Sequence, residues 1–330
     1  MRESTMIETT RREYNAGQDY LRIRQFLIAT FALYGGPTNW LLDRWNFCRY
    51  FAVPVHTFYN MSYFSVPTLT HKPFRDEVAA WEKTIWVWEN SVGEIVGVFN
   101  SANEEAGEAF CQVHPDYTHL YGEMVDHAEE HLADRVDGVG YVKLYVYEGT
   151  ALEQVAQAKG YTRINRRGVH REYKITGEEE TPVLPEGFVI RTVAEKDNLE
   201  ERRKAKGISF GAHYAPSDWP PAWVYREMEK APDYRPELDL YIEAPNGDCA
   251  SFCTIWVDEE NRYANFEPVG SRVEYQGMGL ARALLMEGFQ LMAQHGVTRS
   301  FMDSNNEFYS KVGFEDTGRS YYPWFKHFEI

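Results

Sequence analysis

The sequence predicts a mixed α/β protein, with mixed sheets of the α+β type, built as two tandem domains of one plan. Its 330 residues allow two domains of roughly 150 residues each. Two patterned regions carry a similar order of helices and strands. Between them, residues 178–186 combine a run of glutamates with two prolines, which is typical of a linker. We therefore expect domains at residues 1–177 and 187–330, called here the N-terminal and C-terminal halves.

The C-terminal half opens with a β-rich run and continues with helical patterns. Residues 217–230 begin with two N-cap candidates, Ser217 and Asp218, and have prolines in the first turn. Apolar residues recur at helical spacing from Met278 to His295, and Gly296 follows as a C′ residue. The expected elements are strand 187–193, helices 195–210 and 217–230, strands 238–244, 249–257 and 263–270, helix 278–295, strand 299–303, helix 307–312 and a final strand.

The N-terminal half has a similar plan. The expected elements are helices 20–35 and 39–51, strands 84–90, 94–100 and 107–113, helix 120–136, strand 141–148, helix 151–161 and a closing strand 167–175. This amounts to an internal repeat of about 155 residues.

Charge and cysteine content limit the possible partners and compartment. The chain has 34 basic and 50 acidic residues and a net charge of −16, which disfavours nucleic acid and anionic lipid and permits a cationic amine substrate. Its four cysteines form no CxxC pair and no zinc-site spacing. The polar N-terminus lacks a signal-peptide pattern, and no apolar run is long enough to span a membrane. We expect a reduced, cytoplasmic protein without a metal site.

The strongest local signal is a strand that leads into a glycine-rich loop and then a long helix, over residues 267–282. Gly277 and Gly279 allow the backbone to approach an anion closely, and free N–H groups at the helix start would bind a pyrophosphate. A P-loop is excluded because no Gly-Lys-Ser/Thr follows, and the dinucleotide-binding pattern is also missing. The alternative is a tight turn into a core helix.

This segment resembles motif A of the GNAT superfamily, whose Q/R-x-x-G-x-G/A signature is matched by Gln276, Gly279 and Ala281. Pro268 cannot donate to a strand ladder, so it favours a gap in the sheet beside it. The resemblance implies acetyl-CoA as the acyl donor, with pantetheine in this gap. The cofactor-binding residues that it implies are Val269, Gly270, Ser271, Gln276, Gly277, Met278, Gly279, Leu280, Ala281 and Arg282.

A second match lies at residues 305–314, which are similar to the closing pattern of the superfamily. Tyr309 precedes Gly313 and Phe314 by the expected spacing, and a tyrosine here protonates the departing CoA thiolate in relatives. The alternative is a tyrosine that only packs against CoA. An asparagine of this segment often contacts CoA, and the sequence leaves Asn305 and Asn306 open.

The reaction also needs a general base, because an amine attacks a thioester only as the neutral species. Glu267 lies just before the gap, where some GNAT enzymes have a catalytic glutamate; a substrate-orienting or solvated residue is the alternative. His213 and Tyr214 are weaker candidates on the substrate side. The final aromatic residues, Tyr321, Tyr322, Trp324 and Phe325, would line the acceptor pocket or belong to the core.

The N-terminal half lacks both functional marks. Alignment of Tyr117 with Tyr275 puts Thr118, His119, Leu120 and Tyr121 in place of the glycine loop, and Ala156 takes the place of Tyr309. We expect this half to be structural or to shape the substrate site. Its helix also contains an H-x-x-E-H pattern at residues 127–131, which we interpret as a solvated helix surface because no third ligand is evident.

The leading hypothesis is therefore an N-acetyltransferase that transfers acetyl from acetyl-CoA to a primary amine, of an acceptor that is a small molecule, by direct attack in a ternary complex. An N–H near Val269 would stabilise the oxyanion. One alternative is a non-catalytic acyl-CoA-binding or regulatory protein. Another is a tandem enzyme resembling mycothiol synthase. Fold analogy does not identify the acceptor.

Overall fold

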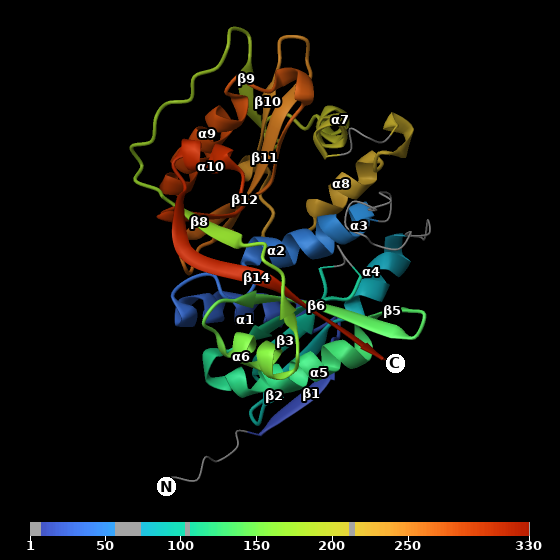
Figure 1. The fold of residues 1–330 in the computed structure, drawn as a ribbon. Helices are drawn as coiled ribbons and strands as arrows, with labels where there is room; N and C mark the ends of the chain where they lie inside the picture. Colours follow the sequence, from blue (N-terminus) through green and yellow to red (C-terminus); the bar gives the residue numbers. More distant parts are fainter. Residues whose placement is uncertain (1–7, 57–73, 103–105, 211–214, 330) are drawn as a thin grey trace.

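The computed structural model describes residues 8–56, 74–102, 106–210 and 215–329. Within them, both halves share one 14-stranded mixed sheet, with the main order β1-β2-β3-β4-β6-β14-β8-β13-β12-β11-β10-β9. This confirms the predicted mixed α/β class. The strands β8 and β14 run between the two halves (Figure 1).

The C-terminal half follows the predicted order of elements. They are β9 (Val189–Thr192), α7 (Leu199–Phe210), α8 (Ala222–Met228), β10 (Asp239–Glu243), β11 (Cys249–Asp258), β12 (Tyr263–Ser271), α9 (Leu280–Gln294), β13 (Arg299–Asp303), α10 (Glu307–Val312) and β14 (Glu315–Glu329). Short 3-10 turns lie between them at η4 (Pro216–Asp218), η5 (Pro236–Leu238) and η6 (Val273–Tyr275). Apolar residues of α9 pack on β10, β11 and β12 to form the core of this half.

The N-terminal half contains more elements than predicted. They are β1 (Thr9–Glu13), α1 (Asp19–Tyr34), α2 (Leu42–Phe47), the π-helix η1 (Cys48–Ala52), α3 (Val53–His56), α4 (Phe74–Glu82), β2 (Trp86–Asn90), β3 (Ile95–Asn100), β4 (Glu108–Val113), η3 (Pro115–Leu120), α5 (Tyr121–His131), β5 (Asp134–Val136), β6 (Val139–Tyr147), α6 (Ala151–Ala158), β7 (Thr162–Arg163) and β8 (Gly168–Lys174).

The predicted helix 120–136 is wrong at its C-terminal end. The helix stops at His131, and residues 134–136 form β5, which pairs with β6. Asp137 and Gly138 join these strands with φ values of 51° and 79°. An Asp-Gly pair with two positive φ angles is the favoured two-residue hairpin turn, so the local turn overrides the helical pattern.

The closing strands of the two halves are exchanged, which the sequence did not predict. The strand β8 lies between β13 and β14 in the C-terminal part of the sheet, and β14 continues alongside β6 in the N-terminal part. Both strands can take either position because each is an antiparallel partner with alternating burial, and a sequence pattern does not distinguish equivalent slots. The exchange joins the halves through backbone hydrogen bonds.

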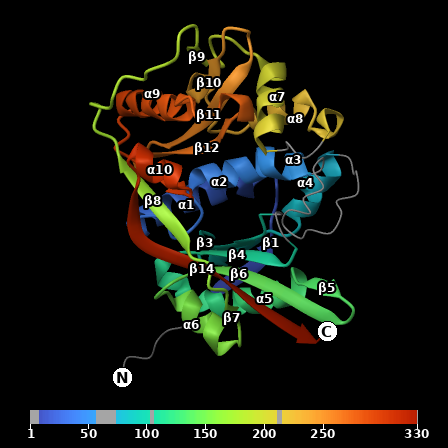
Figure 2. The same cartoon turned by 45° about the horizontal axis from the view of Figure 1, so that its top comes forward.

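Helices of the N-terminal half also pack against the C-terminal half. An apolar cluster combines Phe47 and Phe51 with Tyr225, Met228 and Trp256. In a second view, α1 and α2 lie between the strands of the upper and lower parts of the molecule (Figure 2). This face of the C-terminal sheet, which α7 and α8 also cover, is therefore partly built by the other half.

Candidate active site

The strands β12 and β13 pair in parallel over only three residues and then separate. Their last paired residues are Asn265 and Phe301, yet β12 continues to Ser271. On the other edge of β12, Glu267 and Pro268 together face a single residue of β11, which is a β-bulge. The gap predicted beside Pro268 is thus present and begins immediately after Asn265. We call it the splay.

The glycine-rich loop leads directly to the start of α9. Gly277 and Gly279 have φ values of 78° and 79°, and a Cβ added at either would point into open space. Gly279 is the N-cap, and the N–H of Ala283 donates to its carbonyl. The N–H groups of the first three helical residues, from Leu280 to Arg282, therefore precede the first helical hydrogen bond. This arrangement fits a pyrophosphate.

The side chains of this loop differ in exposure and contacts. Met278 is 40% exposed, whereas Leu280 is buried in the core and offers only its backbone. Gln276 is exposed, and its amide reaches the carbonyl of Ser271 at 3.5 Å. Arg282 donates to the carbonyl of Lys311 on α10 (3.1 Å) and pairs with Glu180 of the linker (2.9 Å).

Tyr309 and Glu267 are near each other, although they come from α10 and β12. Burial, together with the nearby Glu267 carboxylate, raises the pKa of Tyr309 to about 12. The ring of Tyr309 also packs edge-on against Phe308 and Phe314. The backbone of Glu267 is fixed by the indole N–H of Trp256, which donates to its carbonyl (2.7 Å). The structure thus brings both predicted catalytic side chains to the splay.

The strand beyond the bulge is held by β11. A Cβ on Gly270 would lie 2.4 Å from the ring of Phe252, so only glycine allows this close packing. Ser251 donates to the carbonyl of Gly270 and contacts the hydroxyl of Ser271. Val269 is partly buried against the core. These contacts fix the edge that the resemblance assigns to pantetheine.

The two asparagine candidates have different surroundings. Asn306 is the N-cap of α10, and its side chain accepts from the N–H of Phe308. Asn305 is exposed and donates to the carbonyl of Arg167 (3.0 Å). His213 and Tyr214 lie outside the described residues.

The final aromatic residues divide between two environments. Trp324 is buried in the core of the N-terminal half, and Tyr322 packs against that core. Tyr321 instead contacts the rings of Tyr147 and His170. A Cβ on Gly168 would lie 2.1 Å from the ring of Tyr321, which explains the glycine there.

The equivalent loop of the N-terminal half is closed. The 3-10 helix η3 runs directly into α5, and the N–H of Tyr121 donates to the carbonyl of Thr118. The strands β4 and β6 also separate after two pairs, but protein groups occupy the edge of β4. Asn39 both accepts from the N–H and donates to the carbonyl of Val113, at 3.0 and 3.1 Å. The ring of Phe110 stacks on Tyr145 with centroids 4.8 Å apart.

The H-x-x-E-H helix is not the solvated surface that the sequence predicted. His127 is buried among Trp86, Trp88 and Phe99, because this face of α5 packs against the sheet. Burial lowers the pKa of His127 to about 3, so its ring is neutral. Among the described residues, no group of three or more His, Cys, Asp or Glu side chains could hold a metal ion.

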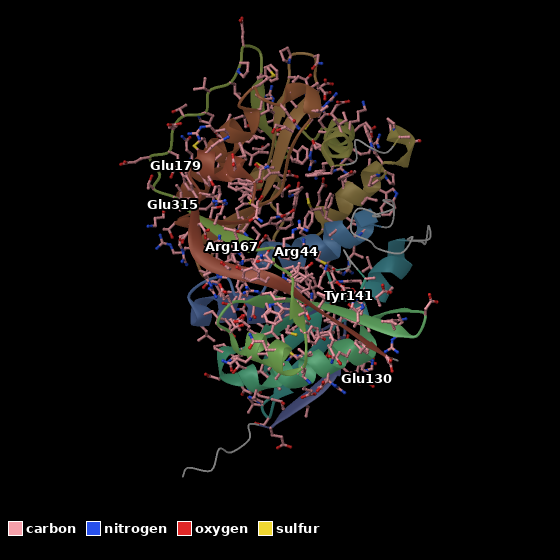
Figure 3. The ribbon with its side chains drawn as sticks, in the orientation of Figure 1. Arg44, Glu130, Tyr141, Arg167, Glu179 and Glu315 are labelled. Atoms are coloured by element: carbon pink, nitrogen blue, oxygen red, sulfur yellow. The ribbon has the colours of Figure 1, made fainter. Side chains whose placement is uncertain are left out.

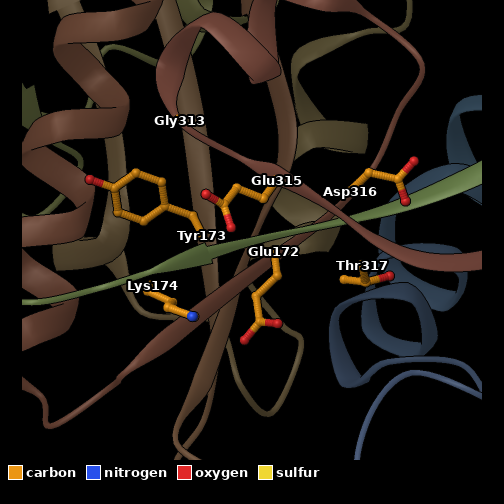
Figure 4. A pocket seen from close by; sticks show the side chains of 7 residues that line it. All are labelled: Glu172, Tyr173, Lys174, Gly313, Glu315, Asp316 and Thr317. Carbon is orange, nitrogen blue, oxygen red and sulfur yellow. The ribbon is translucent and has the colours of Figure 1, made fainter.

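A surface hollow of about 380 Å³ lies where β8 and β14 diverge. It is lined by Glu172, Tyr173, Lys174, Gly313, Glu315, Asp316 and Thr317 (Figure 4). None of the predicted site residues lines it. Glu315 lies on the same side of the molecule as Glu179 of the linker (Figure 3).

Comparisons with known proteins place this geometry in context. Residues 209–314 match the model of the Acetyltransferase (GNAT) family. No curated protein matches the sequence. In the part of the chain that the structure describes, no helix is both long and apolar enough to cross a bilayer.

Three solved structures are similar over nearly the whole chain. A GCN5-related N-acetyltransferase from Sphaerobacter thermophilus has a TM-score of 0.59 at 18% identity, with 98% of this chain and 96% of that chain covered. A tandem GNAT protein from the clavulanic acid biosynthesis pathway has a TM-score of 0.57 at 13% identity, with 97% and 98% covered. An acetyltransferase from Colwellia psychrerythraea has 0.54 at 13%, with 96% and 100% covered. These similarities show the fold.

Proposed function

We propose that this chain, whose residues 209–314 form a GNAT acetyltransferase domain, is an acetyl-CoA-dependent N-acetyltransferase with its active site in the C-terminal half. The acceptor is the primary amine of a small molecule. The observation that carries the proposal is the open glycine loop at the start of α9, beside a splay that contains both Tyr309 and Glu267. The N-terminal half supplies walls and strands.

The reaction would proceed by direct attack. The neutral amine attacks the thioester carbonyl carbon, a C–N bond forms, and the oxyanion is stabilised by an N–H near Val269. Collapse of the intermediate breaks the C–S bond and gives the amide and the CoA thiolate. Glu267 takes the proton of the amine, directly or through water, and Tyr309 gives a proton to the thiolate. Transfer from Glu267 back to Tyr309 completes the cycle.

The electrostatic contact between these two residues favours this order. An ionised Glu267 is one of the causes that raise the pKa of Tyr309, after burial. When Glu267 accepts the proton of the amine, that negative charge disappears, and the phenol becomes a stronger acid. Tyr309 therefore gains acidity at the moment when the thiolate forms.

Calorimetric titration with acetyl-CoA tests the site. The variants Gly279→Glu and Met278→Glu each put a carboxylate at the start of α9, where it would repel a pyrophosphate, and Met278 has no positive φ to complicate folding. We expect each variant to lose about 100-fold in affinity. The matched control is Gly122→Glu at the start of α5, where a Cβ also meets open space. Its acetyl-CoA affinity should be unchanged.

A thiol-release assay over a panel of amines then tests turnover. Release of CoA that depends on an amine supports the enzyme. Tight acetyl-CoA binding without any turnover would instead indicate a non-catalytic acyl-CoA-binding protein. No binding to the wild type would refute the proposed function.

A further inference from the structure

A chain of three polar side chains runs from the N-terminal half to the splay. The hydroxyl of Tyr147, at the end of β6, contacts Nε2 of His170 on β8. The other ring nitrogen, Nδ1, contacts a carboxylate oxygen of Asp303, the last residue of β13. His170 is buried, whereas the side chain of Asp303 is 51% exposed. The exposed end of the chain is thus a carboxylate, and its buried end belongs to the other half.

The proton positions in this chain follow from the contacts. For a neutral imidazole, only one assignment gives every group a complementary partner: the O–H of Tyr147 donates to Nε2, and Nδ1–H points at Asp303. The reverse tautomer would aim a lone pair at a carboxylate. His170 therefore holds Asp303 in one orientation, and Tyr147 sets the tautomer of His170.

The carboxylate of Asp303 lies at the mouth of the splay. Asp303 is two residues beyond Phe301, the last residue of β13 that pairs with β12, and Glu267 is two residues beyond the corresponding Asn265. Strand alternation puts the side chains of Asp303 and Phe301 on the same face. Phe301 packs against Phe31 of α1, so this face is turned toward the N-terminal half.

The charges around Asp303 are negative. Among the described residues, no lysine or arginine forms an ion pair with it; its ionic contact is His170. Asp43 of α2 is buried behind the same face, and burial raises its pKa to about 6, with the charge of Asp303 as a further cause. A fixed carboxylate that has no cationic partner is suited to bind a cation from solution.

We propose that Asp303 binds a second ammonium group of the acceptor, one that does not react, so that the preferred acceptors are diamines and related dications. The reacting nitrogen must become neutral, and a carboxylate held beside it would keep it protonated. A non-reacting ammonium stays charged throughout and matches a permanent carboxylate. This inference rests on the proposed function and gives the N-terminal half a part in acceptor recognition, through His170 and Tyr147 as positioning residues.

Calorimetry with 1,4-diaminobutane, on protein saturated with CoA, tests the inference directly. We expect the wild type to bind the diamine at least about tenfold more tightly than butylamine, and the Asp303→Asn variant to lose this preference while it keeps its affinity for acetyl-CoA. The control Glu315→Gln removes one charge from the hollow of Figure 4 and should leave the preference intact. If it reduced the preference equally, the overall charge of the molecule would explain the effect and the inference would be wrong.

The positioning residues are tested by a pair of variants at His170. An asparagine retains an amide donor near the place of Nδ1, whereas an alanine does not. We expect His170→Ala to raise the KM for the diamine several-fold with little change in kcat, and His170→Asn to restore most of the loss. Equal defects in both variants, or a defect in kcat alone, would contradict a positioning role.

The outcomes separate this inference from the proposed function. If the wild type binds acetyl-CoA but does not prefer the diamine, the assignment of Asp303 is wrong and the transferase proposal stands. If it does not bind acetyl-CoA, both are wrong.

Discussion

The two halves of the molecule use the same strand, loop and helix for opposite results. In the C-terminal half, the loop before α9 has two glycines with positive φ and leaves the first N–H groups of the helix available. In the N-terminal half, η3 continues into α5, and the N–H of Tyr121 is used within the turn. A shared fold therefore does not imply a shared site, since the anion-binding property depends on a few backbone angles.

The difference extends from the loop to the strand edge. Both halves have a parallel pair that separates early, β12 with β13 and β4 with β6. In the N-terminal half, Asn39 and Tyr34 hydrogen-bond the backbone of Val113, which stands at the place of Ser271 in the alignment of Tyr117 with Tyr275. The same gap is thus filled by protein in one half and provides the splay in the other.

The largest expected effect concerns the chemistry that only the C-terminal half contains. Removal of the Tyr309 hydroxyl, in Tyr309→Phe, should lower kcat by about 10²- to 10³-fold, because the thiolate loses its proton donor. Acetyl-CoA affinity, measured by calorimetry, should change little, since the ring still packs against Phe314. Tyr322→Phe, which removes a hydroxyl from the other half, is the control. A kcat within twofold of the wild type would reduce Tyr309 to a packing residue.

A smaller effect is expected when the filled gap is opened. Asn39→Ala leaves the buried N–H and carbonyl of Val113 without this partner, although Tyr34 still donates to the carbonyl. The free energy of unfolding, from urea titration, should fall by about 3 kcal/mol. Acetyl-CoA binding should remain at one site per chain, because α5 still lacks an open glycine loop. The exposed Asn246→Ala is the control and should cost no more than about 1 kcal/mol. A second acetyl-CoA site in Asn39→Ala would contradict the comparison.

The sequence predicts those parts of the site that are local. The strand, loop and helix from Glu267 to Arg282 carry their own signal, because positive φ values and a free helix start depend on adjacent residues. The hairpin at Asp137 and Gly138 was also readable from its turn dipeptide, but the helical charge pattern before it concealed the turn.

The exchanged strands and the residues they bring together were not predictable in this way. His170 and Asp303 pair across β8 and β13, and the register of strands so far apart in sequence is set by tertiary packing. Likewise, the burial of His127 depends on which face of α5 meets the sheet. Such contacts carry no local pattern.

The smallest effect concerns the interface between the halves, where Lys206 of α7 is buried. Among the described residues its ammonium has no hydrogen-bond partner, and it lies over the rings of Phe51, Tyr225 and Phe252 at 4.9, 5.1 and 5.7 Å. Burial lowers its pKa from 10.5 to about 8. Keeping this group charged at pH 7 therefore costs the folded state about 3 kcal/mol, partly offset by the contacts with the three rings.

Lys206→Met should consequently stabilise the protein by about 1 to 2 kcal/mol at pH 7. The folded pKa lies below the unfolded one, so the unfolded chain binds more protons between pH 8 and 10.5, and wild-type stability rises with pH across that window. Thermal unfolding of both proteins at pH 7 and pH 10.5 measures the difference, which should shrink at the higher pH. Lys174→Met, on the exposed side of β8, should change stability by less than about 0.5 kcal/mol at either pH. A Lys206→Met protein that is less stable than the wild type at pH 7 would mean that the aromatic contacts outweigh the cost of burying the charge, so that Lys206 helps to hold the two halves together.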